Sequence, residues 1–173
     1  MLFNSLTYLV LLFSVIVLYW ILPYRARLIL IFSASLIFYG FWRIEFLPVM
    51  LFSVVVDYLV ALRMPMSVKA IKKRLLLVSL VTNIGLLFYF KYLIFFSENA
   101  LGFANLFGAK IDPFVLKILL PLGISFYTFQ TISYTVDVYR GYIKPEKDFV
   151  LYGCYVTFFP QLIAGPVLRA KEV

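Results

Sequence analysis

A chain of 173 residues that is 64% hydrophobic and only 14% charged does not have the composition of a water-soluble domain, in which roughly half of the residues are apolar and about a quarter are charged. Its net charge of +8 would suit a nucleic-acid binder, but the basic residues stand in short gaps between apolar runs, as cytoplasmic loops of membrane proteins do. No nucleic-acid partner is therefore predicted. No metal site is predicted either, because the chain has no histidine and one cysteine, Cys154, and zinc needs a cluster of such ligands.

The apolar runs predict an all-α, polytopic integral membrane helical bundle with about five to six membrane segments. About 20 residues at 1.5 Å each are needed to cross a ~30 Å hydrocarbon core. The predicted segments form a single transmembrane region and cover residues 2–22, 28–42, 46–62, 75–96, 122–139 and 149–164. The first is expected to be a retained span, because no basic residue precedes it and no small-residue cleavage site follows it.

The gaps between the segments predict the orientation of the chain. The gap from Arg63 to Arg74 contains five basic residues and no acid, and short loops of this kind stay in the cytoplasm. Contact with anionic lipid headgroups is an alternative role for the same gap. Alternation then places the N-terminus outside, together with the gaps at 43–45 and 97–112, whereas the gaps at 25–27 and 140–148 lie inside. A short interfacial helix is expected over 114–120.

The segment 122–139 differs from an ordinary membrane anchor because it is rich in polar side chains. Six of these carry a hydroxyl or an amide: Ser125, Thr128, Gln130, Thr131, Ser133 and Thr135. Polar groups in hydrocarbon are costly without partners, so this segment is expected to face protein or water. Steps of three and four put four of the hydroxyls near one helix face, where they bond to backbone or to a neighbouring helix, or else line a polar channel.

Charged residues near the ends of the segments carry further predictions. Asp137 and Arg140, three residues apart, are predicted to pair on one helix face, either as a helix-end pair or as part of a polar cavity. Asp57 is expected to have a structural ion-pair or hydrogen-bond partner, with a substrate role as the alternative. Lys91 is expected to extend its amine outward from the end of its span.

The last segment, 149–164, is predicted to be broken at Pro160 and to stop at Gly165 and Pro166. Gln161, beside the break, can satisfy backbone groups that the proline frees. If the segment crossed fully, Arg169 and Lys171 would lie outside, against the expected charge bias. A re-entrant segment is therefore the alternative to a span.

Two strings, LLPLGISFYTFQTISYTVDVYRG (119–141) and FFPQLIAGPVLR (158–169), resemble the membrane-bound O-acyltransferase family, and within it the bacterial alginate O-acetylases and related polysaccharide acetylases. The resemblance extends from about Leu2 to Val173. Members of that family are much longer and carry an essential histidine in their C-terminal half. The resemblance thus implies that this chain is the N-terminal part of such an enzyme, that the catalytic histidine lies beyond Val173, and that residues 1–173 are inactive alone.

The function implied by the resemblance is the transfer of acetyl groups from a cytoplasmic donor, acetyl-CoA or another acetyl donor, to a cell-envelope or exported polysaccharide. It also implies exported or periplasmic acetylation proteins as partners, a location in the bacterial inner membrane, and no bound cofactor. The residues expected to line a substrate channel are Ser125, Thr128, Gln130, Asp137, Arg140 and Gln161. None is expected to be catalytic, because no histidine is present to activate a nucleophile. The alternatives are D-alanyl transfer to teichoic acid within the same family, a channel or transporter subunit, and an inactive remnant.

Overall fold

The computed structural model describes residues 6–92 and 121–164. Every regular element in these two ranges is helical, which confirms the all-α expectation. The predictions for the gap 97–112, for the interfacial helix 114–120, and for residues 165–171 lie outside the described residues.

The helices follow the predicted apolar runs with shifted ends. They are α1 (Leu6–Ile21), α2 (Tyr24–Arg43), the 3₁₀ turn η1 (Ile44–Phe46), α3 (Leu47–Arg63), α4 (Lys69–Leu87), the π-helical turn η2 (Phe88–Tyr92), α6 (Ile124–Arg140), α7 (Phe149–Thr157) and α8 (Gln161–Ala164).

Proline and glycine set several helix ends. Pro23 precedes α2 in an extended conformation, and Pro48 stands in the first turn of α3, where its missing N–H costs little. Gly141 ends α6 with a φ of 79°, in the left-handed region that glycine adopts without strain. The Tyr142 N–H then bonds to the Asp137 carbonyl at 2.9 Å, so this helix end is a Schellman cap.

Two stretches of the described chain are long and apolar enough to cross a membrane by length and composition. They are Tyr24–Arg63, a helical run of 40 residues that includes η1, and Lys69–Tyr92, with 24 residues. Helix α1 is apolar but shorter. Helix α7 has 9 residues, which gives a length of about 14 Å, well short of a ~30 Å hydrocarbon core. The number of five to six membrane segments stays a prediction.

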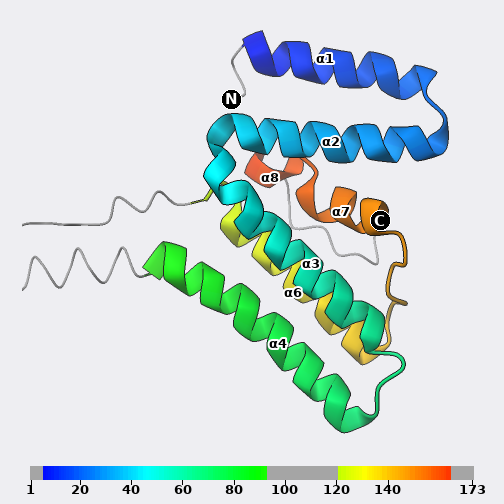
Figure 1. Cartoon of the computed structure of the whole chain (residues 1–173), viewed down its shortest axis with the longest axis vertical. Helices are drawn as coiled ribbons and strands as arrows, with labels where there is room; N and C mark the ends of the chain where they lie inside the picture. The colour runs from blue at the N-terminus through cyan, green and yellow to red at the C-terminus, as the bar shows by residue number, and fades with distance from the viewer. Residues whose placement is uncertain (1–5, 93–120, 165–173) are drawn as a thin grey trace, which may run out of the picture.

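Figure 1 shows the arrangement of the helices. Helices α3, α4 and α6 pack side by side, α2 packs on α1, and α7 packs against α2. The α1–α2 turn, the α3–α4 loop and the α6–α7 connection lie on the same side of the molecule, at the right of the view. These are the three gaps that alternation places in the cytoplasm.

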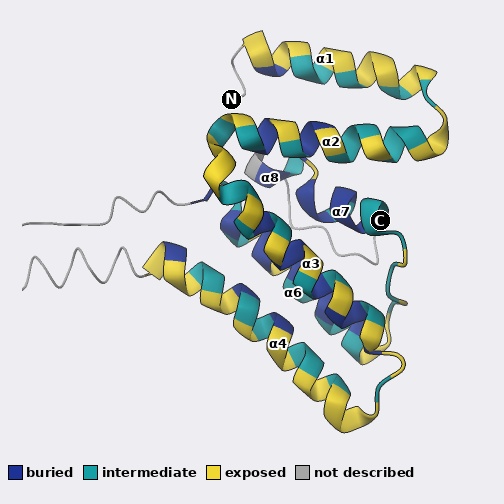
Figure 2. Cartoon of the chain, viewed as in Figure 1, coloured by how far each residue is buried: buried dark blue, intermediate teal, exposed yellow. Residues whose placement is uncertain are grey.

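The main buried core joins α2, α3, α6 and α7, and the outer faces of the molecule are apolar. Tyr39, Met50 and Tyr127 are fully buried. By contrast, the outer faces of α1 and α4 are exposed in Figure 2 and carry large apolar side chains such as Phe13 and Val81. Exposed apolar faces of this extent are typical of helices that lipid or further protein covers.

Candidate functional site

A buried polar network joins α3, α4 and α6. Asn83 is at its centre: the side-chain amide donates to the Asp57 carboxyl group at 2.7 Å, and its amide oxygen accepts from Ser53 Oγ at 2.7 Å and from Thr131 Oγ1 at 3.1 Å. Ser79 Oγ donates to the other Asp57 oxygen at 2.5 Å. All five side chains are buried. Both oxygens of the carboxyl group therefore have a donor, as a buried polar group requires.

The network decides between some of the expected roles. Asp57 has the structural hydrogen-bond partners that were expected of it, and they come from a neighbouring helix. Thr131 bonds across to α4, which is the helix-to-helix use of a hydroxyl. Thr128 and Thr135, on the same face of α6, are also buried, and their hydroxyls have no hydrogen-bond partner within the described residues. Ser125 is only half-buried.

The predicted pair of Asp137 and Arg140 is wrong. No ion pair joins these two described residues; the Arg140 guanidinium instead lies 5.9 Å from the centre of the Tyr142 ring. Arg140 is the last residue of α6 and is exposed. Because the chain reverses at Gly141, the Tyr142 ring comes within reach of the guanidinium, and a cation–π contact is available there without desolvating the charge.

A cavity of about 480 Å³ lies beside the C-terminal half of α6. Its lining comes from α2, α6, the connection 141–148, α7, and the break that leads into α8. The residues are Ile31, Tyr134, Ile143, Lys144, Glu146, Leu151, Tyr152, Cys154, Tyr155, Phe158 and Gln161. The size is that of a small-molecule site, and the mostly apolar and aromatic lining with a few polar groups is typical of one.

Three tyrosines dominate the cavity wall. The Tyr134 and Tyr152 rings lie 4.8 Å apart and the Tyr134 and Tyr155 rings 6.2 Å apart, measured between centroids. Gln130 supports this wall from behind, because its side-chain amide donates to the Tyr155 carbonyl at 2.7 Å. The Tyr152 hydroxyl is buried without a hydrogen-bond partner among the described residues.

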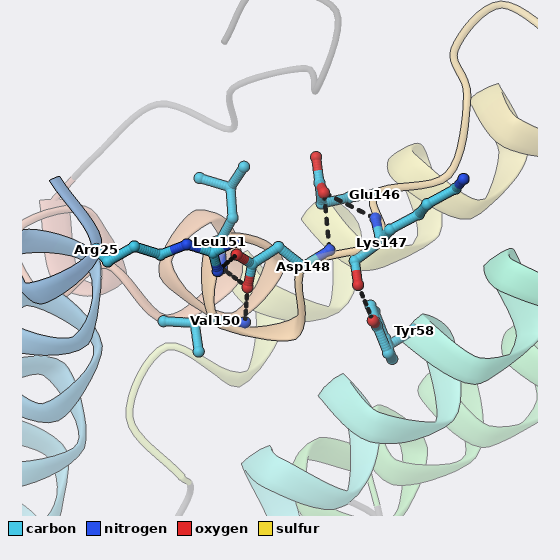
Figure 3. A network of polar contacts seen from close by, with 7 residues as sticks. All are labelled: Arg25, Tyr58, Glu146, Lys147, Asp148, Val150 and Leu151. Atoms are coloured by element: carbon cyan, nitrogen blue, oxygen red, sulfur yellow. Dashed lines mark hydrogen bonds and ion pairs between the residues drawn. The ribbon is translucent and has the colours of Figure 1, made fainter.

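The connection 141–148 forms one wall of the cavity and is bonded to three helices; Figure 3 shows the contacts with α2 and α3. Asp148 accepts from Arg25 of α2 at 2.7 Å, and the Tyr58 hydroxyl of α3 donates to the Lys147 carbonyl at 2.5 Å. The Glu146 N–H donates to the Tyr134 hydroxyl of α6 at 2.8 Å. Hydrogen bonds from α2, α3 and α6 therefore position this wall.

Asp148 also starts α7. Its Oδ1 accepts from the Val150 N–H at 2.9 Å, and it faces the Leu151 N–H at 3.4 Å, so it is the N-cap of this helix. Glu146 Oε1 accepts from the backbone N–H groups of Lys147 and Asp148. An aspartate immediately before an apolar run is a helix-start signal, and it could have identified this position from the sequence.

The cavity ends at the break that the sequence predicts at Pro160. Helix α7 stops at Thr157 and α8 begins at Gln161, so the break is confirmed. Of the expected channel residues, Gln161 lines the cavity and Gln130 supports its wall. Ser125, Thr128, Asp137 and Arg140 are not part of its lining.

The chemistry available at this site is binding. Lys144 and Glu146 supply one charge of each sign to the lining, and the tyrosine rings supply apolar surface. The described residues contain no cluster of three or more metal-ligating side chains. The thiol of Cys154 donates to the Leu28 carbonyl at 3.2 Å, and no histidine is present to activate it.

The chain is similar to several proteins that are named as O-acetylases. It is 40% identical to a probable alginate O-acetylase AlgI of Azotobacter vinelandii over 159 residues, which are 90% of this chain and 32% of that protein. It is 39% identical to a probable alginate O-acetylase AlgI of Pseudomonas aeruginosa over 177 residues, covering 100% of this chain and 34% of the relative. It is also 34% identical to a peptidoglycan O-acetyltransferase of Helicobacter pylori, covering 81% of this chain and 30% of the relative.

No family model matches the chain, and no solved structure matches it. The chain spans about a third of the length of the relatives it matches. Over the matched residues, the chain is homologous to the alginate and peptidoglycan O-acetylases. This confirms the resemblance of its two motif strings to the alginate O-acetylase branch of the membrane-bound O-acyltransferase family.

Proposed function

We propose that this chain is part of a membrane O-acetyltransferase that moves acetyl groups from a cytoplasmic donor to a cell-envelope or exported polysaccharide. The observation that carries the proposal is the similarity along 81–100% of the chain to proteins named for O-acetylation of alginate or peptidoglycan. Two long apolar helices support a membrane location. The acceptor is a polysaccharide in this proposal because the names of these relatives specify glycan acceptors.

The cavity beside α6 is the part of this chain that we assign to the acyl donor. It lies next to the α6–α7 connection, on the side that alternation puts in the cytoplasm, where acetyl-CoA or another acetyl donor is available. The Lys144 ammonium can attract an anionic donor, and the rings of Tyr134 and Tyr155 can cover its apolar part. Ser125, Thr128, Gln130, Asp137, Arg140 and Gln161 remain the channel candidates.

The chemical step belongs to a histidine outside this chain in our proposal. Residues 1–173 contain none, and a general base is needed to remove the proton of a sugar hydroxyl during acyl transfer. The resemblance to the membrane-bound O-acyltransferase family implies that this base is a histidine beyond Val173, and we expect residues 1–173 to have no acetylation activity alone. The chain would supply one wall of the donor path.

The proposed setting is the bacterial inner membrane, with about five to six membrane segments, the N-terminus outside, and exported acetylation proteins as partners. This orientation is supported by the position of three gaps on one side of the molecule: the α1–α2 turn, the α3–α4 loop and the α6–α7 connection. These gaps and the helix ends beside them carry most of the basic residues. The short α7 and the break at Pro160 support a re-entrant end of the segment 149–164. D-alanyl transfer, a channel or transporter subunit, and an inactive remnant are not favoured by the named relatives.

A pair of matched substitutions tests the role of the cavity. Leu151→Trp adds an indole ring to the cavity lining, whereas Leu77→Trp makes the same change on the exposed face of α4. Each variant is made in the native protein, in a host from which the gene has been deleted. The ester-linked acetate that mild base releases from the envelope polysaccharide is measured at equal protein abundance.

The expected result is a strong loss of polysaccharide acetate with Leu151→Trp and near-native acetate with Leu77→Trp. If deletion of the gene leaves the acetate content of every exported and envelope polysaccharide unchanged, the proposed function is wrong. If deletion removes the acetate but Leu151→Trp is as active as Leu77→Trp, the enzyme assignment stands and the cavity does not serve the donor.

A further inference from the structure

The α3–α4 loop and the first turns of α4 form an exposed surface that has no part in the proposed donor site. It carries five basic residues and no acid: Arg63, Lys69, Lys72, Lys73 and Arg74. Four of them are exposed, and the half-buried Lys72 holds its ammonium 5.4 Å from the centre of the Tyr139 ring of α6. The basic groups are thus displayed toward the surroundings without an acidic partner on this surface.

The loop is fixed in place by its own contacts. Met64 is fully buried. Ser67 bonds twice to the end of α3, through its hydroxyl to the Arg63 carbonyl at 2.8 Å and through its N–H to the Met64 carbonyl at 3.2 Å. The residues around these anchors therefore have defined positions.

Large apolar side chains project between the basic groups. Met66 is 93% exposed, Val68 is 67% exposed and Ile71 is 48% exposed. Met66 and Val68 come before the basic turn, and the long apolar part of α4 comes after it. If α4 were perpendicular to the membrane, its basic groups would lie at the level of the headgroups. Met66 and Val68, which come before them in the chain, would then extend into water. A loop that lies along the membrane interface avoids this exposure.

We propose that this surface lies in the membrane interface and docks on anionic phospholipid headgroups. Met66, Val68 and Ile71 enter the boundary between headgroups and acyl chains, while Lys69, Lys73, Arg63 and Arg74 reach the phosphate groups. Basic side chains next to exposed apolar ones are the combination that binds an anionic lipid surface. A nucleic acid would match the charge but would leave the apolar side chains in water.

The test uses the native protein in vesicles with an environment-sensitive fluorophore on a cysteine at Met66→Cys, in a background in which Cys154 and every other cysteine of the protein are replaced by alanine. A matched label at Ile44→Cys reports on the α2–α3 turn, on the other side of the molecule. Vesicles of pure phosphatidylcholine are compared with vesicles that also contain phosphatidylglycerol. Fluorescence emission and quenching by acrylamide, a neutral quencher, are measured in both.

The expected result is that phosphatidylglycerol shifts the emission of the Met66→Cys label to the blue and reduces its quenching several-fold, without changing the Ile44→Cys label. Replacing Lys69, Lys73 and Arg74 by glutamine should abolish this response, because each charge removed weakens attraction to an anionic leaflet about fivefold. A label that is quenched equally in both vesicles would show a loop in water. A label that is shielded equally in both, with or without the three charges, would show a loop covered by protein. Either result overturns the proposal.

Discussion

Asn83→Ala tests whether the polar network holds α3, α4 and α6 together. The substitution removes four hydrogen bonds of this side chain. Three join α4 to α3 and α6, through Asp57, Ser53 and Thr131, and the fourth goes to the Ser79 carbonyl within α4. The substitution leaves the apolar packing around Asn83 nearly unchanged apart from a small cavity. We expect a large loss of stability from a single side chain.

The magnitude follows from the number of bonds. A side-chain hydrogen bond between membrane helices contributes about 0.6 kcal/mol on average and at most about 1.7 kcal/mol. Three such bonds therefore contribute about 2–5 kcal/mol, with the upper part of the range reached when the Asp57 carboxyl group loses a donor that nothing replaces. Water cannot compensate, because all five members of the network are buried.

The measurement is the free energy of unfolding of the native protein in mixed micelles, from titration with sodium dodecyl sulfate. Thr82→Ala is the control, since Thr82 is the neighbouring residue of α4 and is only half-buried outside the network. A loss with Asn83→Ala no larger than with Thr82→Ala would refute a role of the network in stability.

Two further substitutions test the neighbourhood of the cavity. Gly123→Ala should destabilise the contact of α6 with α8, because Gly123 has a φ of 68° and an added Cβ would lie 2.6 Å from the Leu162 carbonyl oxygen. The control Gly40→Ala, where an added Cβ meets nothing within 4 Å, should be neutral or slightly stabilising. Equal melting temperatures of the two variants would contradict this account. Asp148→Ala should cost about 1–2 kcal/mol through loss of the α7 cap, whereas Asp148→Asn should cost little, because it keeps the cap and loses only a pair with the exposed Arg25. Equal losses for both Asp148 variants, measured by thermal unfolding, would mean that the ion pair and not the cap stabilises this end.

The sequence predicted buried contacts where polar side chains occur within an apolar segment. Hydroxyls at helical spacing in an apolar segment predicted the buried face of α6, because such groups need partners in hydrocarbon. The same reasoning predicted a partner for Asp57. It did not identify Ser79 and Asn83, because the pairing of residues 22 and 26 positions apart in the chain depends on how two helices are rotated against each other.

The cavity was harder to predict. Its lining depends on aromatic residues such as Tyr134 and Tyr155, which do not stand out in a chain that is 20% aromatic. The pair of Asp137 and Arg140 was wrong because spacing on a helix permits an ion pair without requiring it. At the end of α6, the turn at Gly141 offered Arg140 an aromatic ring instead.

The hydrogen bonds of Asn83 have a consequence for the angular setting of α6. Apolar contacts between helices in lipid constrain rotation about the helix axis only weakly. The reason is that an apolar side chain packs almost equally well against lipid and against protein. A hydrogen bond is directional, and the one from Thr131 to Asn83 holds only at one rotation of α6. Tyr134 follows Thr131 by three residues, which is nearly one turn of α6. The rotation of α6 that the Thr131–Asn83 bond favours therefore also sets the direction in which the Tyr134 ring points. The shape of the cavity is thus encoded in part by an amide that never touches it.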